Sequence, residues 1–482
     1  MNGSRSATGS AGHYAQTVNA TPRVHLVTLG CARNEVDSDE LAGRLLADGW
    51  ELADAASEAD LVLVNTCGFI DAAKSDSISA VLDIAEQRPV VATGCMAERY
   101  GTELAQALPE AAAVVGFDHY PVIGETLRAV LQGVALPVHT PRDRRTLLPV
   151  TPVLRSTIDT PVPGHGTSAQ LGGSSDRILR HRLIKGPVAA LKIASGCDRR
   201  CAFCAIPFFR GAFVSRPPAD IVAEARALVA EGVVEVVLVS ENSTAYGKDL
   251  AGVGLEALLR DLSDVEGLHR IRVSYLQPAE VRPALLDAMA ALPAVAPYVD
   301  ISFQHASGPL LRRMRRFGDA ASFLGLIGQI RDRVPDAGIR SNVIVGFPGE
   351  TARDLEVLTD FLNEARLDAV GVFGYSDEEG TEAAGLPGQV HADAIAERVA
   401  MVGELVDLTS AERAEQRIGS TLQLLVEHTG DPVVGRAEVQ GPEDGGCLWF
   451  GAAAEVTAGR IVPVVVRGTD GADLFVEMGG AG

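Results

Sequence analysis

The stretch VAALKIASGCDRRCAFCAIP, residues 188–207, places three cysteines directly after an apolar run that is typical of a buried strand. Three residues separate Cys197 from Cys201, and two separate Cys201 from Cys204. This spacing allows one short loop to hold an iron–sulfur cluster, because such clusters require soft thiolate ligands. A tetrahedral zinc site would need a fourth ligand, and the nearest histidine, His181, precedes the strand. The stretch therefore predicts a 4Fe–4S cluster with one iron that has no protein ligand.

The same stretch opens a series of six strand–helix units between residues 186 and 375. The six apolar runs are VAALKIAS, VVEVVLVS, RIRVSYLQ, YVDISFQH, IRSNVIVGF and AVGVFGYS. Helix-like segments such as PADIVAEARALVAEG lie between them. Right-handed connections curl parallel strands into a barrel, and six units leave it open on one side. We therefore predict an open (β/α)₆ partial barrel with the cysteine loop at the carboxyl ends of its strands, where sites in such folds gather.

A second set of cysteines lies in the first block of the chain, residues 23–141. Its apolar runs RVHLVTLG, ADLVLVNTC and PVVATGC alternate with helix-like segments such as NEVDSDELAGRLLADG, which indicates a parallel α/β domain. Each run ends at a cysteine: Cys31, Cys67 or Cys95. Parallel strands end at one edge of a sheet, so these thiols are expected to converge on a second cluster. The alternative is a small buried residue at each position, the commoner role of a single cysteine at a strand end.

The remaining segments predict further domains. Residues 1–22 are small and polar and predict a disordered tail. Residues 142–185 are rich in Gly, Ser, Thr and Pro and predict a flexible linker. The six-unit domain, residues 186–417, ends in a helical stretch. Residues 418–482 carry short strands separated by Gly and Asp, which predicts a small all-β barrel with Cys447 in its core.

The composition restricts the class of partner. The 482 residues carry a formal net charge of −21, which repels phosphate backbones and favours a basic protein over nucleic acid. The sequence has no apolar run of bilayer length and no secretory signal. We therefore expect a cytoplasmic protein without a membrane partner, whose cysteines are reduced and available for metal. The densest basic run, RRMRRF at residues 312–317, is expected to form a solvated helix face.

The pattern Cys-x₃-Cys-x₂-Cys after the first strand of a six-fold β/α series resembles the radical S-adenosylmethionine enzymes. The resemblance implies that the open iron chelates S-adenosylmethionine, and that an electron from the cluster cleaves it to a 5′-deoxyadenosyl radical. The catalytic cluster ligands would be Cys197, Cys201 and Cys204. The implied cofactor-binding residues are Phe203, Glu241, Gln304 and Gly346.

Some of these assignments have open alternatives. Gln304 and His305 end the fourth strand, where each can bind substrate or cofactor, or simply pack and hydrogen-bond within the protein. Gly346 can allow close approach of the adenosine group, or serve a turn. Glu241 stands with Asn242 where the family usually has Gln-Asp, in the region that meets the amino group of S-adenosylmethionine.

Two three-cysteine sites narrow the resemblance to the methylthiotransferases. It covers nearly the whole chain after the tail and includes TLGCARNEVDSDE, VNTCGFI, GCDRRCAFCAIPFFRG, IVGFPGET and FGYSDEEGTEAAGL. It implies two 4Fe–4S clusters and two uses of S-adenosylmethionine. One molecule methylates sulfide at the cluster of Cys31, Cys67 and Cys95, and another supplies the radical. It also implies a low-potential electron donor, such as flavodoxin or ferredoxin, and a sulfide source.

Within that family the chain is similar to the branch that modifies an aspartate of small-subunit ribosomal protein S-twelve. LGCARNEVDSDE lacks the Gln-Met that usually precedes the Asn in the branch that modifies tRNA. Residues 418–482 resemble the TRAM domain, yet they carry three basic residues (Arg436, Arg460 and Arg467) against nine acidic ones. Such a surface suits a basic ribosomal protein better than phosphate groups. We therefore expect methylthiolation of the aspartate β-carbon in S-twelve, free or within the small subunit. The alternatives are a tRNA isopentenyladenosine methylthiotransferase and an iron–sulfur carrier protein.

Overall fold

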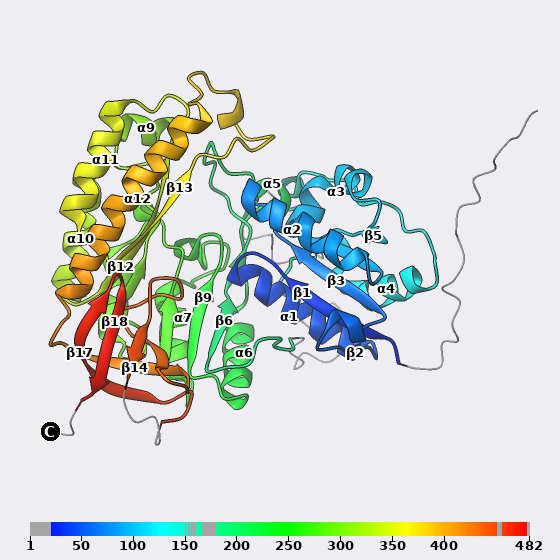
Figure 1. Cartoon of the computed structure of the whole chain (residues 1–482), viewed down its shortest axis with the longest axis horizontal. Coiled ribbons are helices and arrows are strands. Elements are labelled where there is room, and N and C mark those ends of the chain that lie inside the picture. The colour runs from blue at the N-terminus through cyan, green and yellow to red at the C-terminus, as the bar shows by residue number, and fades with distance from the viewer. Residues whose placement is uncertain are drawn as a thin grey trace, which may run out of the picture. The chain divides into compact units, whose positions relative to one another are not determined.

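The computed structural model describes residues 21–149, 151–152, 155, 161–165, 180–450 and 456–479. The predicted tail, apart from its last two residues, and much of the predicted linker lie outside these residues. Contacts between residues divide the chain into two compact units (Figure 1). The first contains the described residues up to Arg142 and the short segment that ends at Leu183. The second contains the other described residues, so the six-strand domain and the C-terminal barrel belong to one unit.

The first unit is built on a parallel sheet, as predicted. Among the described residues the strand order is β2-β1-β3-β4-β5, and neighbouring strands are parallel. The strands are β1 (Arg23–Thr28), β2 (Glu51–Leu52), β3 (Leu61–Thr66), β4 (Val90–Gly94) and β5 (Ala113–Val114). The helices are α1 (Ala32–Ala47), α2 (Asp71–Ala85), α3 (Cys95–Ala107) and α4 (Ile123–Leu131), with the 3₁₀ helices η1 (Ala56–Glu58) and η2 (Phe117–Val122).

Burial in this unit follows the sequence pattern. Every residue of β3 is buried, as in a parallel sheet covered by helices. Val62 and Val64 of β3 pack in one apolar core with Met96 and Leu104 of α3. Helix α1 fills the segment predicted from the charged run, and the chain leaves it at Gly49, whose φ of +79° suits a glycine.

The second unit contains the six predicted parallel strands in two groups, β10-β9-β6 and β11-β12-β13. Parallel bridges from Ile271 to Val295 and from Leu276 to Ile301 link the groups. This is the expected open partial barrel. The strands are β6 (Val188–Lys192), β9 (Glu235–Val239), β10 (Arg270–Val273), β11 (Tyr298–Asp300), β12 (Gly338–Val345) and β13 (Ala369–Gly374).

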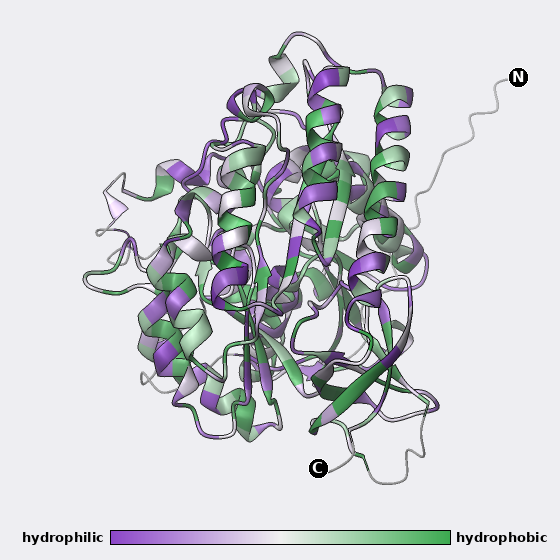
Figure 2. Cartoon of the chain, turned by 90° about the vertical axis from the view of Figure 1, so that its left-hand side faces the viewer, coloured by the Kyte–Doolittle hydropathy of each residue, from purple (hydrophilic) through white to green (hydrophobic). Residues whose placement is uncertain are grey.

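Helices separate these strands along the chain. They are α5 (Ile206–Arg210), α6 (Pro218–Ala230), α7 (Leu255–Ser263), α8 (Pro283–Ala291), α9 (Gly308–Arg313), α10 (Ala320–Arg333), α11 (Ala352–Ala365) and α12 (Ala392–Glu415). The 3₁₀ helices are η3 (Arg144–Leu147), η6 (Ser243–Ala245), η7 (Pro278–Glu280) and η8 (Ala383–Gly385). Most of these helices mix hydrophobic and hydrophilic residues along their length (Figure 2). Among the described residues, no helix is both long enough and apolar enough to span a bilayer.

The C-terminal segment forms a closed barrel in the order β14-β15-β16-β18-β17. The strands are β14 (Thr421–His428), β15 (Val433–Ala437), β16 (Cys447–Trp449), β17 (Ile461–Asp470) and β18 (Asp473–Met478). Four of these strands lie in the apolar runs TLQLLVEHT, GCLWFG, GRIVPVVVRG and ADLFVEM, from which the barrel is predicted, whereas β15 is a short strand interrupted by Gly435 and was not predicted. Cys447 is fully buried in the barrel core, which confirms the prediction for it.

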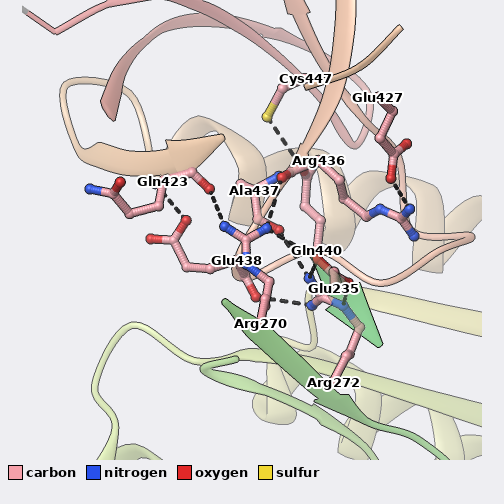
Figure 3. A network of polar contacts seen from close by, with 10 residues as sticks. All are labelled: Glu235, Arg270, Arg272, Gln423, Glu427, Arg436, Ala437, Glu438, Gln440 and Cys447. Atoms are coloured by element: carbon pink, nitrogen blue, oxygen red, sulfur yellow. Dashed lines mark hydrogen bonds and ion pairs between the residues drawn. The ribbon is translucent and has the colours of Figure 1, made fainter. Parts of the chain in front are cut away.

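The C-terminal barrel is bound to the amino ends of the partial-barrel strands by buried polar groups (Figure 3). Arg272 of β10 is fully buried, and its Nε donates to Oε1 of Glu235 on β9 at 2.8 Å. Its Nη1 donates to the carbonyl of Glu438 at 3.0 Å. Arg270 donates to the carbonyls of Gln423 and Arg436 at 2.8 and 3.2 Å. The C-terminal barrel therefore contacts the amino ends of the partial-barrel strands, whereas the cysteine loop follows the carboxyl end of β6.

Arg272→Met is expected to destabilise the second unit strongly. The substitution removes one of the two ion-pair partners that the buried Glu235 has among the described residues, and it removes donors from barrel carbonyls. Loss of one partner of a buried pair costs about 3–5 kcal/mol. Urea unfolding of the anaerobically purified protein measures the effect. Arg467→Met is the control, because Arg467 forms an exposed pair with Glu477 at 2.9 Å and such pairs contribute about 0–1 kcal/mol. Equal costs for the two variants would contradict a structural role for the junction.

Candidate functional site

The cysteine loop of the second unit is closed by a short antiparallel ribbon that the sequence did not predict. Strands β7 (Ala194–Ser195) and β8 (Val214–Ser215) pair on either side of the loop. Within it, the amide of Cys197 donates to the carbonyl of Gly211 at 3.1 Å, and the amide of Cys204 donates to that of Cys201 at 3.2 Å. The ribbon and these bonds fix the backbone from which all three thiols project, and none of the three forms a disulfide.

A residue of the predicted linker holds the loop from outside. Arg155 is 6% exposed and lies 2.8 Å from the carboxylate of Asp198, the residue after the first cluster cysteine. It also donates to the carbonyl of Phe213 at 2.8 Å. The Asp198 carboxylate accepts from the Phe213 amide at 3.1 Å. The sequence does not reveal this role, because the composition around Arg155 is that of a linker. A single arginine in such a segment does not indicate a contact with the loop.

Burial and nearby arginines set the electrostatic environment of the loop thiols. Burial raises the pKa of the Cys197 thiol to about 12, so a thiolate there requires a compensating cation, which a bound metal centre supplies. Two arginines also approach Cys201. Nη1 of Arg316 lies 3.7 Å from its Sγ. Burial lowers the pKa of Arg199, but Cys201 and Glu280 outweigh burial and raise it. Hydrogen-bond donors of this kind are typical of the surroundings of the thiolate ligands of an iron–sulfur cluster.

Phe203 is part of the cysteine loop, and Glu241 lies close enough to affect its first cysteine. Glu241 directly follows β9, and its charge raises the pKa of Cys197, in addition to the larger effect of burial. Its Oε2 is buried and has no hydrogen-bond partner among the described residues. A buried carboxylate oxygen without a donor is costly, so the position favours an added cationic or N–H group. Phe203 is partly buried against the main core of the unit.

Gln304 has an uncommon backbone. Its φ of +72° lies in the left-handed region, which non-glycine residues rarely occupy outside strained or functional positions. Its amide donates to the carbonyl of Asn342 at 2.9 Å, and its carbonyl accepts from the amide of Ile344 at 2.7 Å. Strand β12 therefore holds this conformation at the carboxyl end of the fourth predicted strand.

Gly346 and His305 are both engaged within the protein. A Cβ on Gly346 would lie 2.5 Å from Cγ1 of Ile395 in α12, so packing alone accounts for the glycine. His305 is fully buried, with its Nε2 3.3 Å from Oε1 of Glu350. Its Nδ1 accepts from the amide of Ser307 at 3.0 Å. The Nε2 of His305 has no hydrogen-bond partner among the described residues.

The prediction of a solvated face for RRMRRF is wrong at one position. Helix α9 ends at Arg313, and Arg312, Arg313 and Arg315 are exposed. Arg316 is only 5% exposed and binds the side-chain oxygen of Gln277 and the carbonyl of Ser302. The chain turns after the helix, where Arg315 has a φ of +56°. A basic run gives no sign of such a turn, so the sequence did not reveal the inward arginine.

The first unit brings its three cysteines to one edge of its sheet. Cys31 precedes α1, Cys67 follows β3, and Cys95 is the first residue of α3 after β4. The strand ends are packed backbone to backbone. A Cβ on Gly30 would lie 2.9 Å from the Cβ and 3.0 Å from the Sγ of Cys67, and a Cβ on Gly68 would lie 2.7 Å from Cα of Met96. The backbone segments that carry the three cysteines therefore lie close together.

Asn34 connects these strand ends, a role that the sequence analysis did not identify. It is fully buried, and its Nδ2 donates to the carbonyls of Leu29 and Thr66 at 2.9 and 3.2 Å. Its Oδ1 accepts from the thiol of Cys95 at 3.4 Å. The Nε of Arg33 donates to the sulfur of Cys31 at 3.4 Å. A donor therefore lies beside the Cys31 sulfur and an acceptor beside the Cys95 thiol.

Neither set of thiols resembles a site for one ion. Among the described residues, no group of three His, Cys, Asp or Glu side chains is placed to hold a single metal ion. Zinc gathers four ligands around one atom, whereas the cysteines of a 4Fe–4S cube bind different irons and stand farther apart. With three cysteines each, both sets are one ligand short of a structural zinc site.

Comparisons with known proteins agree with this chemistry. Residues 23–116 match the model described as "Uncharacterized protein family UPF0004", and residues 191–362 match the Radical SAM superfamily. A solved structure of the radical S-adenosylmethionine methyltransferase TsrM from Kitasatospora setae has a TM-score of 0.52 and 16% identity, with 73% of each chain covered. At that identity it supports the fold alone.

Curated relatives are much more similar. A protein of Cutibacterium acnes is 57% identical over 94% of this chain and 97% of its own length. Proteins of Nocardioides sp. and Streptomyces griseus are 56% and 53% identical, each over 94% of this chain and at least 96% of their own length. Each is named "Ribosomal protein uS12 methylthiotransferase RimO". With this identity over nearly its whole length and a radical S-adenosylmethionine domain, the chain belongs to the RimO family of methylthiotransferase enzymes.

Proposed function

We propose that this protein adds a methylthio group to the β-carbon of an aspartate in ribosomal protein uS12, the S-twelve protein, with S-adenosylmethionine as both methyl donor and radical source. The observation that carries the proposal is the pair of three-cysteine sites, each at the carboxyl end of parallel strands. When bound, the two 4Fe–4S clusters supply the electron that cleaves S-adenosylmethionine and an open iron for the sulfur to be transferred.

The residues of the second unit have distinct proposed roles. Cys197, Cys201 and Cys204 hold the catalytic cluster. Glu241 accepts a hydrogen bond from the amino group of S-adenosylmethionine, which would satisfy its buried Oε2. Phe203 lies beside the adenine. Gln304 and Gly346 complete the cofactor site at the strand ends, where Gln304 positions a polar side chain by its left-handed backbone.

In the first unit, Cys31, Cys67 and Cys95 hold the second cluster. Asn34 links the ends of β1 and β3 through its bonds to Leu29 and Thr66, so it helps to fix the direction in which Cys31 and Cys67 project. The unit thereby keeps the sulfur to be transferred at a rigid edge rather than on a loop.

The surface of the C-terminal barrel supports a protein substrate. Two of its three arginines are already engaged, because Arg436 is buried and paired with Glu427, and Arg467 pairs with Glu477. Few cationic groups remain for phosphate contacts, which disfavours the tRNA alternative. We propose that this barrel is a TRAM-like domain, and that residues 23–141, 186–417 and 418–482 are the functional domains.

The reaction also requires electrons and sulfide from outside the chain. We propose a flavodoxin or ferredoxin as electron donor and an external sulfide source, and action on uS12 or the small ribosomal subunit in the cytoplasm. The two half-reactions consume S-adenosylmethionine in different ways, since one transfers its methyl group and the other breaks its bond to the adenosyl carbon.

Mass spectrometry of uS12 and of total tRNA from a strain that lacks this protein tests the function. We expect the methylthio mass to disappear from the uS12 aspartate, the tRNA modifications to remain, and the intact gene to restore the modification of uS12. Loss of a methylthio group from tRNA alone would contradict the proposed substrate. No change in either molecule would favour an iron–sulfur carrier.

A further inference from the structure

The contacts of Arg316 connect three parts of the cluster site. Its guanidinium binds the side-chain oxygen of Gln277, which follows β10, and the carbonyl of Ser302, which follows β11. The same nitrogen that binds Gln277 lies 3.7 Å from the sulfur of Cys201. The carboxyl ends of two strands therefore hold this cation against one cluster ligand.

The charge of Arg316 lacks the usual compensation. It is 5% exposed, and its hydrogen bonds to Gln277 and Ser302 use neutral oxygens. Among the described residues it forms no ion pair with a carboxylate. Burial and the neighbouring Arg199 lower its pKa, and Cys201 and Cys197 oppose this effect only in part. Arg199 is different, because Glu280 lies 2.5 Å from its Nη1 and neutralises it. A buried cation without a carboxylate is costly unless another anion is present, and here the anion is the thiolate-bound cluster.

We propose that Arg316 is a positioning residue that raises the reduction potential of the cluster held by Cys197, Cys201 and Cys204, through its charge and its hydrogen bond to the Cys201 sulfur. The inference rests on the proposed function, because it assumes a cluster at these cysteines. Reduction adds negative charge to the cluster, so a nearby buried cation stabilises the reduced form more than the oxidised form. Removal of the cation makes the cluster harder to reduce.

The test measures the midpoint potential of this cluster directly. The background is the full-length chain with Cys31→Ala, Cys67→Ala and Cys95→Ala, reconstituted anaerobically, so that only one cluster contributes to the electron paramagnetic resonance signal. In a redox titration, Arg316→Gln is expected to shift the midpoint to more negative potential. Cleavage of S-adenosylmethionine with a fixed reductant is expected to decrease about tenfold or more, as for other partners of metal ligands.

Arg315→Gln is the matched control. It removes the same charge one residue away, from an exposed side chain paired with Glu382 at 2.6 Å, and its midpoint should equal that of the background. Arg316→Lys keeps the charge, and its midpoint potential should lie between those of the control and Arg316→Gln. If the glutamine variant does not fold, the lysine variant carries the test, and its midpoint must be more negative than that of the control.

If the midpoint potential of Arg316→Gln equals that of the control, the proposal is overturned. Where only Arg316→Lys folds, an equal midpoint for that variant overturns it in the same way. This holds even if cluster occupancy falls, because an unchanged midpoint shows a purely structural role. Failure of the proposed function would appear separately. In that case the background chain would bind no redox-active cluster, or uS12 would keep its modification in the deletion strain, whatever the midpoint of the Arg316 variants.

Discussion

Cys201→Ala is expected to abolish reductive cleavage of S-adenosylmethionine. Cys201 is the middle ligand of the cysteine loop and the one that Arg316 approaches. The substitution leaves two thiols, which are too few to hold the cluster that delivers the electron. Anaerobic incubation with dithionite and chromatography of 5′-deoxyadenosine measure cleavage. Iron content should decrease from about eight to about four atoms per chain.

Cys447→Ala is the matched control for this experiment. It makes the same chemical change at a cysteine that is fully buried in the C-terminal barrel, where its thiol donates to Oε1 of Gln440 at 3.2 Å. Iron content and cleavage should both stay at the level of the unmodified protein. Cleavage by Cys201→Ala at the rate of this control would show that the loop does not hold the catalytic cluster.

Cys67→Ala is expected to separate the two half-reactions. Cys67 belongs to the other unit, where its amide donates to Oγ of Ser77 at 3.0 Å. Its loss removes the cluster of the first unit but not the ligands of the second. Cleavage of S-adenosylmethionine should remain largely intact, whereas transfer of the methylthio group to uS12 should fall below detection. Both are measured in one reaction, by chromatography and by mass spectrometry of uS12.

An equal loss of cleavage and transfer in Cys67→Ala would contradict separate roles for the two clusters. Iron analysis distinguishes this from general damage, since the variant should retain about four irons per chain. Ser77→Ala provides a milder perturbation of the same strand end. It removes the hydroxyl that the Cys67 amide bonds to and should lower transfer only partly.

The sequence predicted the fold best where apolar runs were long. The six strands of the partial barrel and the three strands of the first unit that lead to cysteines lie in apolar runs of the sequence, and their parallel order follows from alternation with helices. Short strands were missed because they are too short to contain such an apolar run. Strands β7 and β8 have two residues each, and β15 contains Gly435, so none of them carries a strand pattern.

The candidate sites were predictable only as far as the cysteines. Their spacing and strand-end positions are visible in the chain itself. The residues that support them are polar groups whose direction depends on tertiary structure. Arg155 stands in a linker-like segment, Arg316 follows a turn that a basic run does not reveal, and Asn34 lies in an ordinary helix start. Such partners become visible only when the loops are folded.

The most direct test of the account is the metal content of the anaerobically reconstituted, unmodified protein, measured together with its Mössbauer spectrum. Two three-cysteine sites predict about eight irons per chain, all in 4Fe–4S clusters. Bound zinc in place of iron, or only about four irons per chain, would contradict the central claim that both cysteine sets hold a cluster with an open iron.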